Sequence, residues 1–252
     1  MRFFTWIPVW RRNLDVFKKL FLVNFFLPLL EPLFYLFAFG FGLGAMVGEV
    51  EGLPYKIFIL PAIVAMATLN ASFFYTTYSS FVKMIFQKTF DAIIATPLSI
   101  EDVVVGEIMW GATRGMISGI MVLVLFLILK LITIKIAVLY LPLIIILSFI
   151  FSSLGMFFTA VVNNIESFNY PIFLYFTPML FFSGTFFPVS QLPEWLRFVS
   201  LLVFPLTVML KSFRTPFTVF DLKTYFLSFL TIIHGLFFFM ISIKLMRRKL
   251  IK

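Results

Sequence analysis

The chain has 252 residues, of which 62% are hydrophobic and only 12% are charged, whereas a soluble domain carries about a quarter charged residues. This composition excludes water as the main solvent and indicates an integral membrane protein. The net charge of +9 comes mostly from basic residues at the ends of apolar runs, which indicates membrane topology and not nucleic-acid binding, and the lack of cysteine excludes disulfides and thiolate metal sites.

Residues 1–20 are predicted to form an amphipathic helix. Its aromatic and aliphatic residues recur every three or four positions, while Arg and Lys residues occupy the remaining positions. The residues on the apolar face are Trp6, Trp10, Leu14, Phe17 and Phe21. Such a helix lies at a membrane surface. Two roles remain open, a plain anchor or a helix that also rests on a cytosolic partner and relays its motion. Because basic residues precede the first apolar run, we expect no cleavable signal peptide.

Six runs are long enough to cross a hydrocarbon core of about 30 Å, which takes roughly 20 residues. They are about Phe21–Met46, Ile57–Phe81, Val103–Leu129, Ile136–Val162, Phe168–Phe187 and Tyr225–Met246. With six spans, twelve basic residues fall on the side of the termini and seven on the other. The bias predicts that both termini are cytosolic. The predicted fold is therefore a single all-α membrane domain over residues 1–252.

The first span contains an acidic residue, Glu31, between Pro28 and Pro32. A carboxylate at membrane depth is costly and marks a functional site by default. Glu31 is therefore a candidate for a translocation pathway or gate. The alternative is a structural role, as the partner of a polar side chain such as Asn24 or Asn70.

A polar interruption follows the second span, at residues 82–100. Phe86, Phe90, Ile93 and Ile94 form an apolar stripe, and polar residues including Asp91 face away. Pro97 ends this helix, and Ser99 is expected to cap the next one. A short helix with both faces suits docking into a groove on another protein. The alternative is a helix that lies on the membrane surface.

The third span begins with three glycines spaced by four residues, Gly111, Gly115 and Gly119, which predicts close packing against another helix. Glu107 and Arg114 lie seven residues apart on nearly the same face. We expect them to pair with each other or with groups on other helices. They serve either structure or a cytosolic gate.

Prolines break the segment after the fifth span into short helices. Residues 188–222 are predicted to form an outer re-entrant segment, because Trp195–Leu210 is short and carries Arg197. Together with Gly184, Pro188 and Pro205, it is a candidate lid over the exit of a pathway.

Several motifs are absent from the sequence. It has no G-x-x-x-x-G-K-[ST] phosphate loop, one His and no nucleophile–base constellation. No internal repeat is evident, although secondary transporters often show one. A secondary transporter or channel that works without ATP remains an alternative, as do an intramembrane enzyme and a scaffold protein.

Three stretches resemble the type-2 ATP-binding-cassette (ABC) export permeases: EPLFYLFAFGFGLG, FDAIIATPLSIEDVVVGEIMWGATRG, and FFSGTFFPVSQLPEW followed by FPLTVMLKSFR. Nearly the whole chain is covered. Where the family often has His or another polar residue in the last stretch, this chain has Val208, although the terminal Arg214 is kept. The departure weakens any assignment of the substrate.

The resemblance implies a complex of two permeases, here a homodimer, and two ABC nucleotide-binding ATPase subunits. ATP and Mg would be bound by the ATPase subunits, with no cofactor on this chain. The segment with Phe86, Phe90, Asp91, Ile94 and Pro97 would be the coupling helix, and the arm with Trp6 and Trp10 the interface helix beside it. The complex would export an amphipathic, lipid-linked or hydrophobic substrate across the cytoplasmic membrane of a prokaryote.

Overall fold

The computed structural model describes residues 4–218 and 221–251. The first three residues of the N-terminal arm and residues 219–220 of the outer segment lie outside this part of the chain. Within it, the structure is helical apart from two short antiparallel strands, β1 (Glu49–Val50) and β2 (Leu53–Pro54), which pair Glu49 with Pro54 and Val50 with Leu53. The predicted all-α membrane class is confirmed.

Most of the apolar runs fold into long helices, several of which contain a π-helical stretch. The first part of the chain forms α1 (Ile7–Lys19), α2 (Phe21–Tyr35), η1 (Leu36–Leu43), α3 (Gly44–Val47), α4 (Tyr55–Phe74), η2 (Tyr75–Ser79), α5 (Ser80–Ile85), α6 (Thr89–Ile94), α7 (Ile100–Ile128) and α8 (Ile134–Val161). The second part forms η3 (Glu166–Phe168), α9 (Asn169–Pro171), η4 (Ile172–Phe176), α10 (Thr177–Phe182), η5 (Val189–Gln191), α11 (Glu194–Val203), α12 (Pro205–Arg214), η6 (Thr215–Phe217), α13 (Leu222–Leu230) and α14 (Ile232–Leu250).

Among the described residues, five helices are long and apolar enough to cross a membrane. They are Leu22–Val47, Tyr55–Ile85, Ile100–Ile128, Ile134–Val161 and Leu222–Leu250. The fifth predicted span differs, because its helix covers only residues 169–182, short of the roughly 20 residues that a span needs. The following helices α11 and α12 meet at 94°, and the number of spans rises to six if this pair is one broken span.

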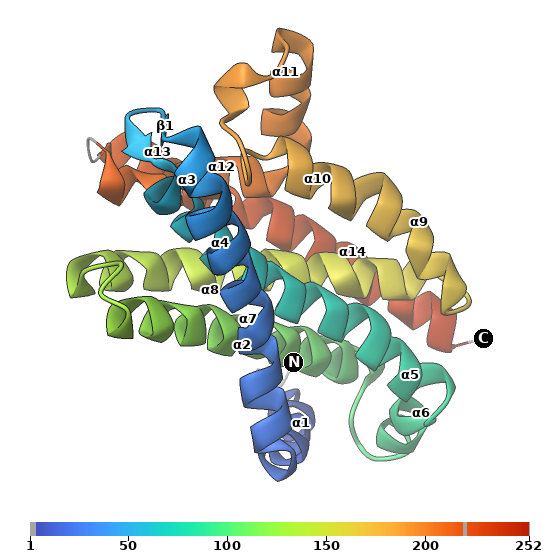
Figure 1. The fold of residues 1–252 in the computed structure, drawn as a ribbon. Helices are drawn as coiled ribbons and strands as arrows, with labels where there is room; N and C mark the ends of the chain where they lie inside the picture. Colours follow the sequence, from blue (N-terminus) through green and yellow to red (C-terminus); the bar gives the residue numbers. More distant parts are fainter. Residues whose placement is uncertain (1–3, 219–220, 252) are drawn as a thin grey trace.

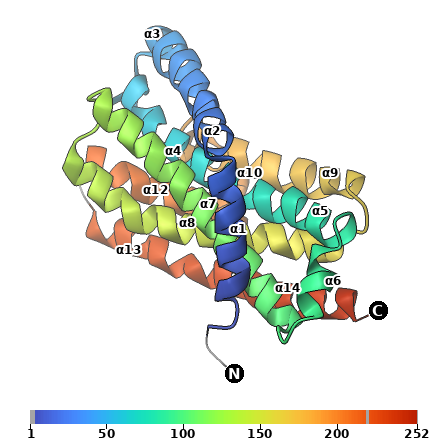
Figure 2. The same ribbon diagram turned by 90° about the horizontal axis from the view of Figure 1, so that it is seen from below.

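The helices place the predicted functional segments at two ends of the molecule. Figure 1 shows α6 and the C-terminal end of α14 at one end, with β1, α12, α13 and the turn between α7 and α8 at the other. Figure 2 shows that α1 crosses the bundle against α7, and the N-terminal part of α1 shares a groove with α6. The coupling segment and the predicted outer lid therefore lie at opposite ends, as the predicted topology requires.

The core is centred on α4, whose residues from Phe58 to Leu69 are all buried. It packs against α7 and α8, and these three helices form one continuous cluster of apolar side chains. By contrast, α2 and α14 leave large apolar side chains exposed, including Phe26, Phe34 and Phe237. These surfaces suit contact with lipid or with a second copy of the chain.

The glycine face predicted on the third span is confirmed by its packing. A methyl group at Gly115 would lie 2.0 Å from Ser72 Oγ and 2.8 Å from the Thr68 carbonyl oxygen. In the same way, Thr76 and Ser152 confine Gly111, Thr68 confines Gly119, and Thr76 confines Gly155. Because no side chain separates the backbones, α4, η2, α7 and α8 approach each other closely.

We predict that Gly115→Ala destabilises the protein by about 1–3 kcal/mol, because the added methyl group overlaps a hydroxyl that is held to the Thr68 carbonyl oxygen. This cost exceeds the roughly 1 kcal/mol that alanine gains over glycine in a helix. Thermal unfolding in detergent measures the change. The control is Gly42→Ala, whose methyl group would be 3.6 Å from its nearest neighbour. Equal melting temperatures for the two variants would contradict the prediction.

Candidate functional site

The predicted coupling segment, residues 82–100, runs from the end of α5 through α6 to the start of α7. After α5 ends at Ile85, Lys88 adopts a left-handed conformation with φ of 52°, which reverses the chain into α6. The expected cap on α7 is confirmed: Ser99 Oγ accepts a hydrogen bond from the Asp102 backbone N–H, and the Asp102 carboxylate accepts one from the Ser99 N–H. The short α6 is thus held between two defined ends.

The predicted coupling residues divide into two groups. Phe86 is 65% exposed, and Asp91 and Pro97 are also exposed, whereas Ile94 is half-buried. Phe90 is fully buried in a cluster of side chains from α5, α7 and η3. The expectation that Phe90 contacts a partner is therefore corrected: its ring anchors α6 to the rest of the chain, and Phe86 is the aromatic side chain that is presented outward.

The N-terminal helix α1 packs on α7 by its aromatic face. The Trp10 indole N–H donates a hydrogen bond to Thr113 Oγ1 at 3.0 Å, and the Trp10 and Phe17 rings both meet Trp110 edge-on. At the start of α1, Val9 fills the space left by Gly106, where a methyl group would lie 2.6 Å from Val9 Cβ and 3.0 Å from the backbone oxygen of the half-buried Trp6. The apolar face of α1 is thus turned into the protein, not toward lipid.

A groove lies between α1 and α6. Its volume is about 380 Å³, and its walls include Pro8 and Arg12 from α1 and Gln87, Thr89 and Ile93 from the coupling segment. Its lining includes both apolar and polar side chains. The groove joins the two segments that the sequence assigned to a partner into a single surface.

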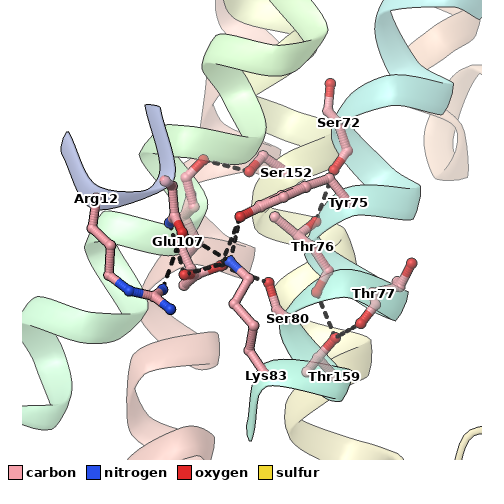
Figure 3. Close-up of polar contacts among 12 residues, drawn as sticks. Arg12, Ser72, Tyr75, Thr76, Thr77, Ser80, Lys83, Glu107, Ser152 and Thr159 are labelled. Atoms are coloured by element: carbon pink, nitrogen blue, oxygen red, sulfur yellow. Dashed lines mark hydrogen bonds and ion pairs between the residues drawn. The ribbon is translucent and has the colours of Figure 1, made fainter. Parts of the chain in front are cut away.

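Behind this surface, Glu107 of α7 is fully buried and accepts hydrogen bonds from three other elements. Lys83 of α5 forms an ion pair with it at 2.6 Å. Asn13 of α1 donates at 2.8 Å, Tyr75 of η2 at 3.2 Å and Ser80 of α5 at 3.0 Å. Figure 3 shows the side chains of Tyr75, Ser80 and Lys83 around the Glu107 carboxylate. The network therefore ties α1, the second span and α7 together.

The sequence left open whether Arg114 pairs with Glu107 or with groups on other helices. In the structure, Arg114 does not pair with Glu107. Its guanidinium donates to Asn24 Oδ1 at 3.4 Å and lies over the rings of Phe17 and Tyr75, at 5.5 and 5.4 Å. It lines a cavity of about 390 Å³ that Lys83 and Asn13 of the network also line. Of the alternatives left open by the sequence, pairing with groups on other helices is the one observed.

Glu31 lies on the open face of α2. The Tyr35 hydroxyl donates to its carboxylate at 3.0 Å and the Asn70 amide at 3.1 Å. The contact with Asn70 is the one named by the structural alternative, in which Glu31 is the partner of a polar side chain. Among the described residues no cation pairs with Glu31, and its side chain stays exposed at membrane depth. This position is compatible with the candidate role in a pathway.

The candidate lid residues lie together at the other end. Gly184 has a φ of 85°, and a methyl group there would lie 2.7 Å from Val189 Cγ2, so both conformation and space call for glycine. Its carbonyl oxygen accepts a hydrogen bond from Arg214 at 2.5 Å. Pro188 is buried just before η5, and Pro205 begins α12 at the bend.

Four members of the buried network were not assigned to a site from the sequence: Asn13, Tyr75, Ser80 and Lys83. Asn13 was the available signal, because it is an uncharged polar residue between apolar positions of an otherwise basic helix. Lys83 follows the second predicted span and was interpreted as a cytosolic charge on the polar face of the predicted coupling helix, not as the partner of a buried carboxylate.

These features define a multi-pass helical membrane protein in which α1 and α6 form one surface at one end. The family model described as "ABC-2 type transporter" matches residues 5–218. The chain is 42% identical to Nodulation protein J of Rhizobium meliloti (strain 1021) over 190 residues, which is 75% of this chain and 72% of that protein. It is 22% identical to Inner membrane transport permease YadH of Escherichia coli (strain K12) over 209 residues, 83% of this chain and 81% of that protein.

The protein is therefore a membrane transport permease, and it belongs to the ABC-2 type transporter family. The predicted resemblance to this family is confirmed. Membership implies an ABC ATPase as partner, to which the permease is the membrane-spanning counterpart.

We predict that Glu107→Gln destabilises the protein by about 3–5 kcal/mol, because Lys83, with only 12% of its side chain exposed, is left as a buried cation without its carboxylate. We expect the double variant Lys83→Met/Glu107→Gln to lose less stability than the sum of the losses measured for the two single variants. A double-mutant cycle of thermal unfolding measures this coupling.

The matched control is Glu101→Gln, which breaks the ion pair with Arg247 at 3.6 Å. Both of its side chains are more than a third exposed, so solvent screens the pair and the expected loss is below about 1 kcal/mol. Similar losses for Glu107→Gln and Glu101→Gln would contradict the structural role given to the buried pair.

Proposed function

We propose that the chain is the permease subunit of an ABC exporter that acts as a homodimer with a separate nucleotide-binding ATPase subunit. ATP and Mg²⁺ bind to the ATPase, while this chain is not itself catalytic and binds no cofactor. The complex moves an amphipathic, lipid-linked or hydrophobic substrate outward across the cytoplasmic membrane of a prokaryote. Both termini are cytosolic in this arrangement, which the bias of basic residues supports.

The observation that carries this proposal is the surface formed by α1 and α6. The groove between them combines apolar and polar groups, and the exposed Phe86 stands beside Gln87 of its wall. An aromatic side chain that seats in a pocket of a partner is a typical source of binding energy at an interface. Phe90 packs α6 against the rest of the chain. We therefore expect a partner that displaces Phe86 to displace α6 as a whole.

Motion of this surface is then transmitted through the Glu107 network. The carboxylate joins α1, α5 and α7, so a pull on α6 acts on α7 as well as on α1. From α7 the glycine face passes the displacement to α4 and α8 without intervening side chains. An ATPase shifts the permease only if its contact with this surface differs between the two states, since a partner that binds both equally changes nothing.

The open face of α2 is the proposed border of the pathway. Glu31 is exposed there with Tyr35 and Asn70, among aromatic residues such as Phe34 and Phe37. A carboxylate facing hydrocarbon is costly, but one that faces a polar path or a second subunit is not. This placement supports a homodimer whose midline is lined by α2.

The direct test is to purify the tagged chain from its native membrane in mild detergent and identify the proteins that accompany it. We expect a stoichiometric soluble subunit with a phosphate loop and vanadate-sensitive ATP hydrolysis. Recovery of the chain alone, under conditions that keep other ABC complexes intact, together with transport driven by an ion gradient, would overturn the proposal in favour of an ATP-independent transporter or channel.

We predict that Phe86→Ala lowers the ATPase activity and subunit recovery of the complex by about tenfold, which corresponds to the loss of an interface side chain worth about 1.4 kcal/mol. The folded permease is expected to be unaffected, because Phe86 is 65% exposed. Phe198→Ala is the matched control, since Phe198 is 68% exposed but lies on α11 at the opposite end. Normal activity of Phe86→Ala would refute the assignment of this surface.

A further inference from the structure

A second cavity opens at the end of the molecule opposite α6. It has a volume of about 340 Å³ and lies between the turn joining β1 to β2, helices α11 and α12, and the start of α13. Figure 1 shows these elements grouped away from α6 and the C-terminus. Three cations line it, Arg197 from α11 and Lys211 and Arg214 from α12. The Glu107 network and the α1–α6 groove contribute nothing to this cavity.

Arg214 is the most deeply placed of the three cations. Only 9% of the residue is exposed, and its guanidinium carbon lies 3.7 Å from the centre of the Phe58 ring. Its Nε donates to the Phe58 carbonyl oxygen at 3.4 Å and its Nη2 to the Gly184 carbonyl oxygen at 2.5 Å. These contacts hold the plane of the guanidinium, but they supply no negative charge. Among the described residues, Nη1 has no hydrogen-bond acceptor.

Two acidic residues of the cavity, Glu51 and Asp221, offset part of the charge of the three cations, and Glu51 acts electrostatically on Lys211 and Arg214. Asp221 caps α13, where it accepts hydrogen bonds from the backbone N–H groups of Lys223 and Thr224 at 3.0 and 3.2 Å. Glu51 accepts a hydrogen bond from Ser190 at 2.9 Å. Within residues 4–218 and 221–251, neither carboxylate forms an ion pair with Arg197, Lys211 or Arg214. The cavity therefore keeps a net positive charge.

The hydroxyl groups of the cavity are already used as donors. Thr215 donates to the Ser212 carbonyl oxygen, Ser190 to Glu51, and Thr224 to Asp221. The remaining donors are then the N–H groups of the cations, including Arg214 Nη1. A buried guanidinium is stable when it is paired with an anion. A cavity that offers several free cationic donors selects an anion with several acceptor oxygens.

We propose that this outer cavity binds a phosphate group. The tetrahedral oxygens of a phosphate group accept hydrogen bonds from an arginine fork and from a lysine at the same time, and its negative charge offsets the excess of cations. The volume fits a phosphate group with a short substituent. The phosphate is either that of a lipid headgroup in the outer leaflet or a water-soluble phosphate. The site does not depend on ATP-driven transport, so it can be tested on the permease alone.

The test uses the full chain, purified in a phosphate-free maltoside detergent and titrated with inorganic phosphate and with a short-chain phosphatidylglycerol by calorimetry. The rim variant Arg197→Gln/Lys211→Gln leaves Arg214 and its structural contacts in place. We expect it to bind the preferred probe at least about tenfold more weakly than the wild type, since two charge-assisted donors are lost. Lys130→Gln/Lys135→Gln is the matched control, because it removes the same charge from exposed positions beside the turn between α7 and α8.

The outcomes separate the sources of the phosphate. Binding of phosphatidylglycerol that excess inorganic phosphate displaces supports a site for phosphate in either form, and binding of the lipid alone assigns the site to a headgroup. In both cases affinity is expected to fall with the rim variant and to stay unchanged in the control. If neither probe binds the wild type, or if the rim variant and the control bind equally well, the proposal is wrong.

Discussion

The ion pair between Lys83 and Glu107 is the interaction on which the end of this permease that carries α1 and α6 depends. Glu107 is completely buried, and a carboxylate in such a place is tolerated only when charge and hydrogen bonds surround it. Here the compensating groups come from three other elements, so the stability of one charge requires α1, the second span and α7 to keep their relative positions. Hydrogen bonds of this kind fix geometry more strictly than apolar contacts, which allow sliding.

The second constraint is that one face of α7 carries glycines and therefore no side chains. Gly111, Gly115 and Gly119 bring its backbone against η2 and α4, where the Thr76 methyl group and the hydroxyls of Ser72 and Thr68 occupy the space that added methyl groups would need. In a membrane, where apolar surfaces gain little by leaving lipid, such close contacts supply much of the packing energy. The polar network and the glycine face act on the same helix, one at its start and the other along its middle. A displacement at the end that carries α1 and α6 therefore reaches the core of the bundle directly.

Much of the architecture followed from the sequence, because hydrophobic length and the spacing of glycines are local properties. The cap at Ser99 and the close packing of Gly115 were predicted for that reason. The partner of Glu107 was not, since Lys83 lies on another span and helical periodicity carries no information about which helices adjoin. Phe90 was correctly placed in an apolar stripe, but such a stripe does not indicate whether its side chains pack against this chain or against another protein. The fifth span was overestimated because apolar composition continues past the point where Ser183 and Gly184 end the helix.

The ABC-2 family membership and the geometry together suggest an order of events that begins at the α1–α6 surface. The central claim is that α1, α6 and α7 move as one body when the ATPase changes state. The chain has no cysteine, so spin labels can be attached to single introduced cysteines at the exposed positions Arg11 on α1 and Asp91 on α6. Distances between them would be measured by electron paramagnetic resonance in the nucleotide-free and the vanadate-trapped complex. The account predicts one unchanged distance within the chain, while the distance between the Asp91 positions of the two copies changes. A distance within the chain that shifts with nucleotide would contradict it.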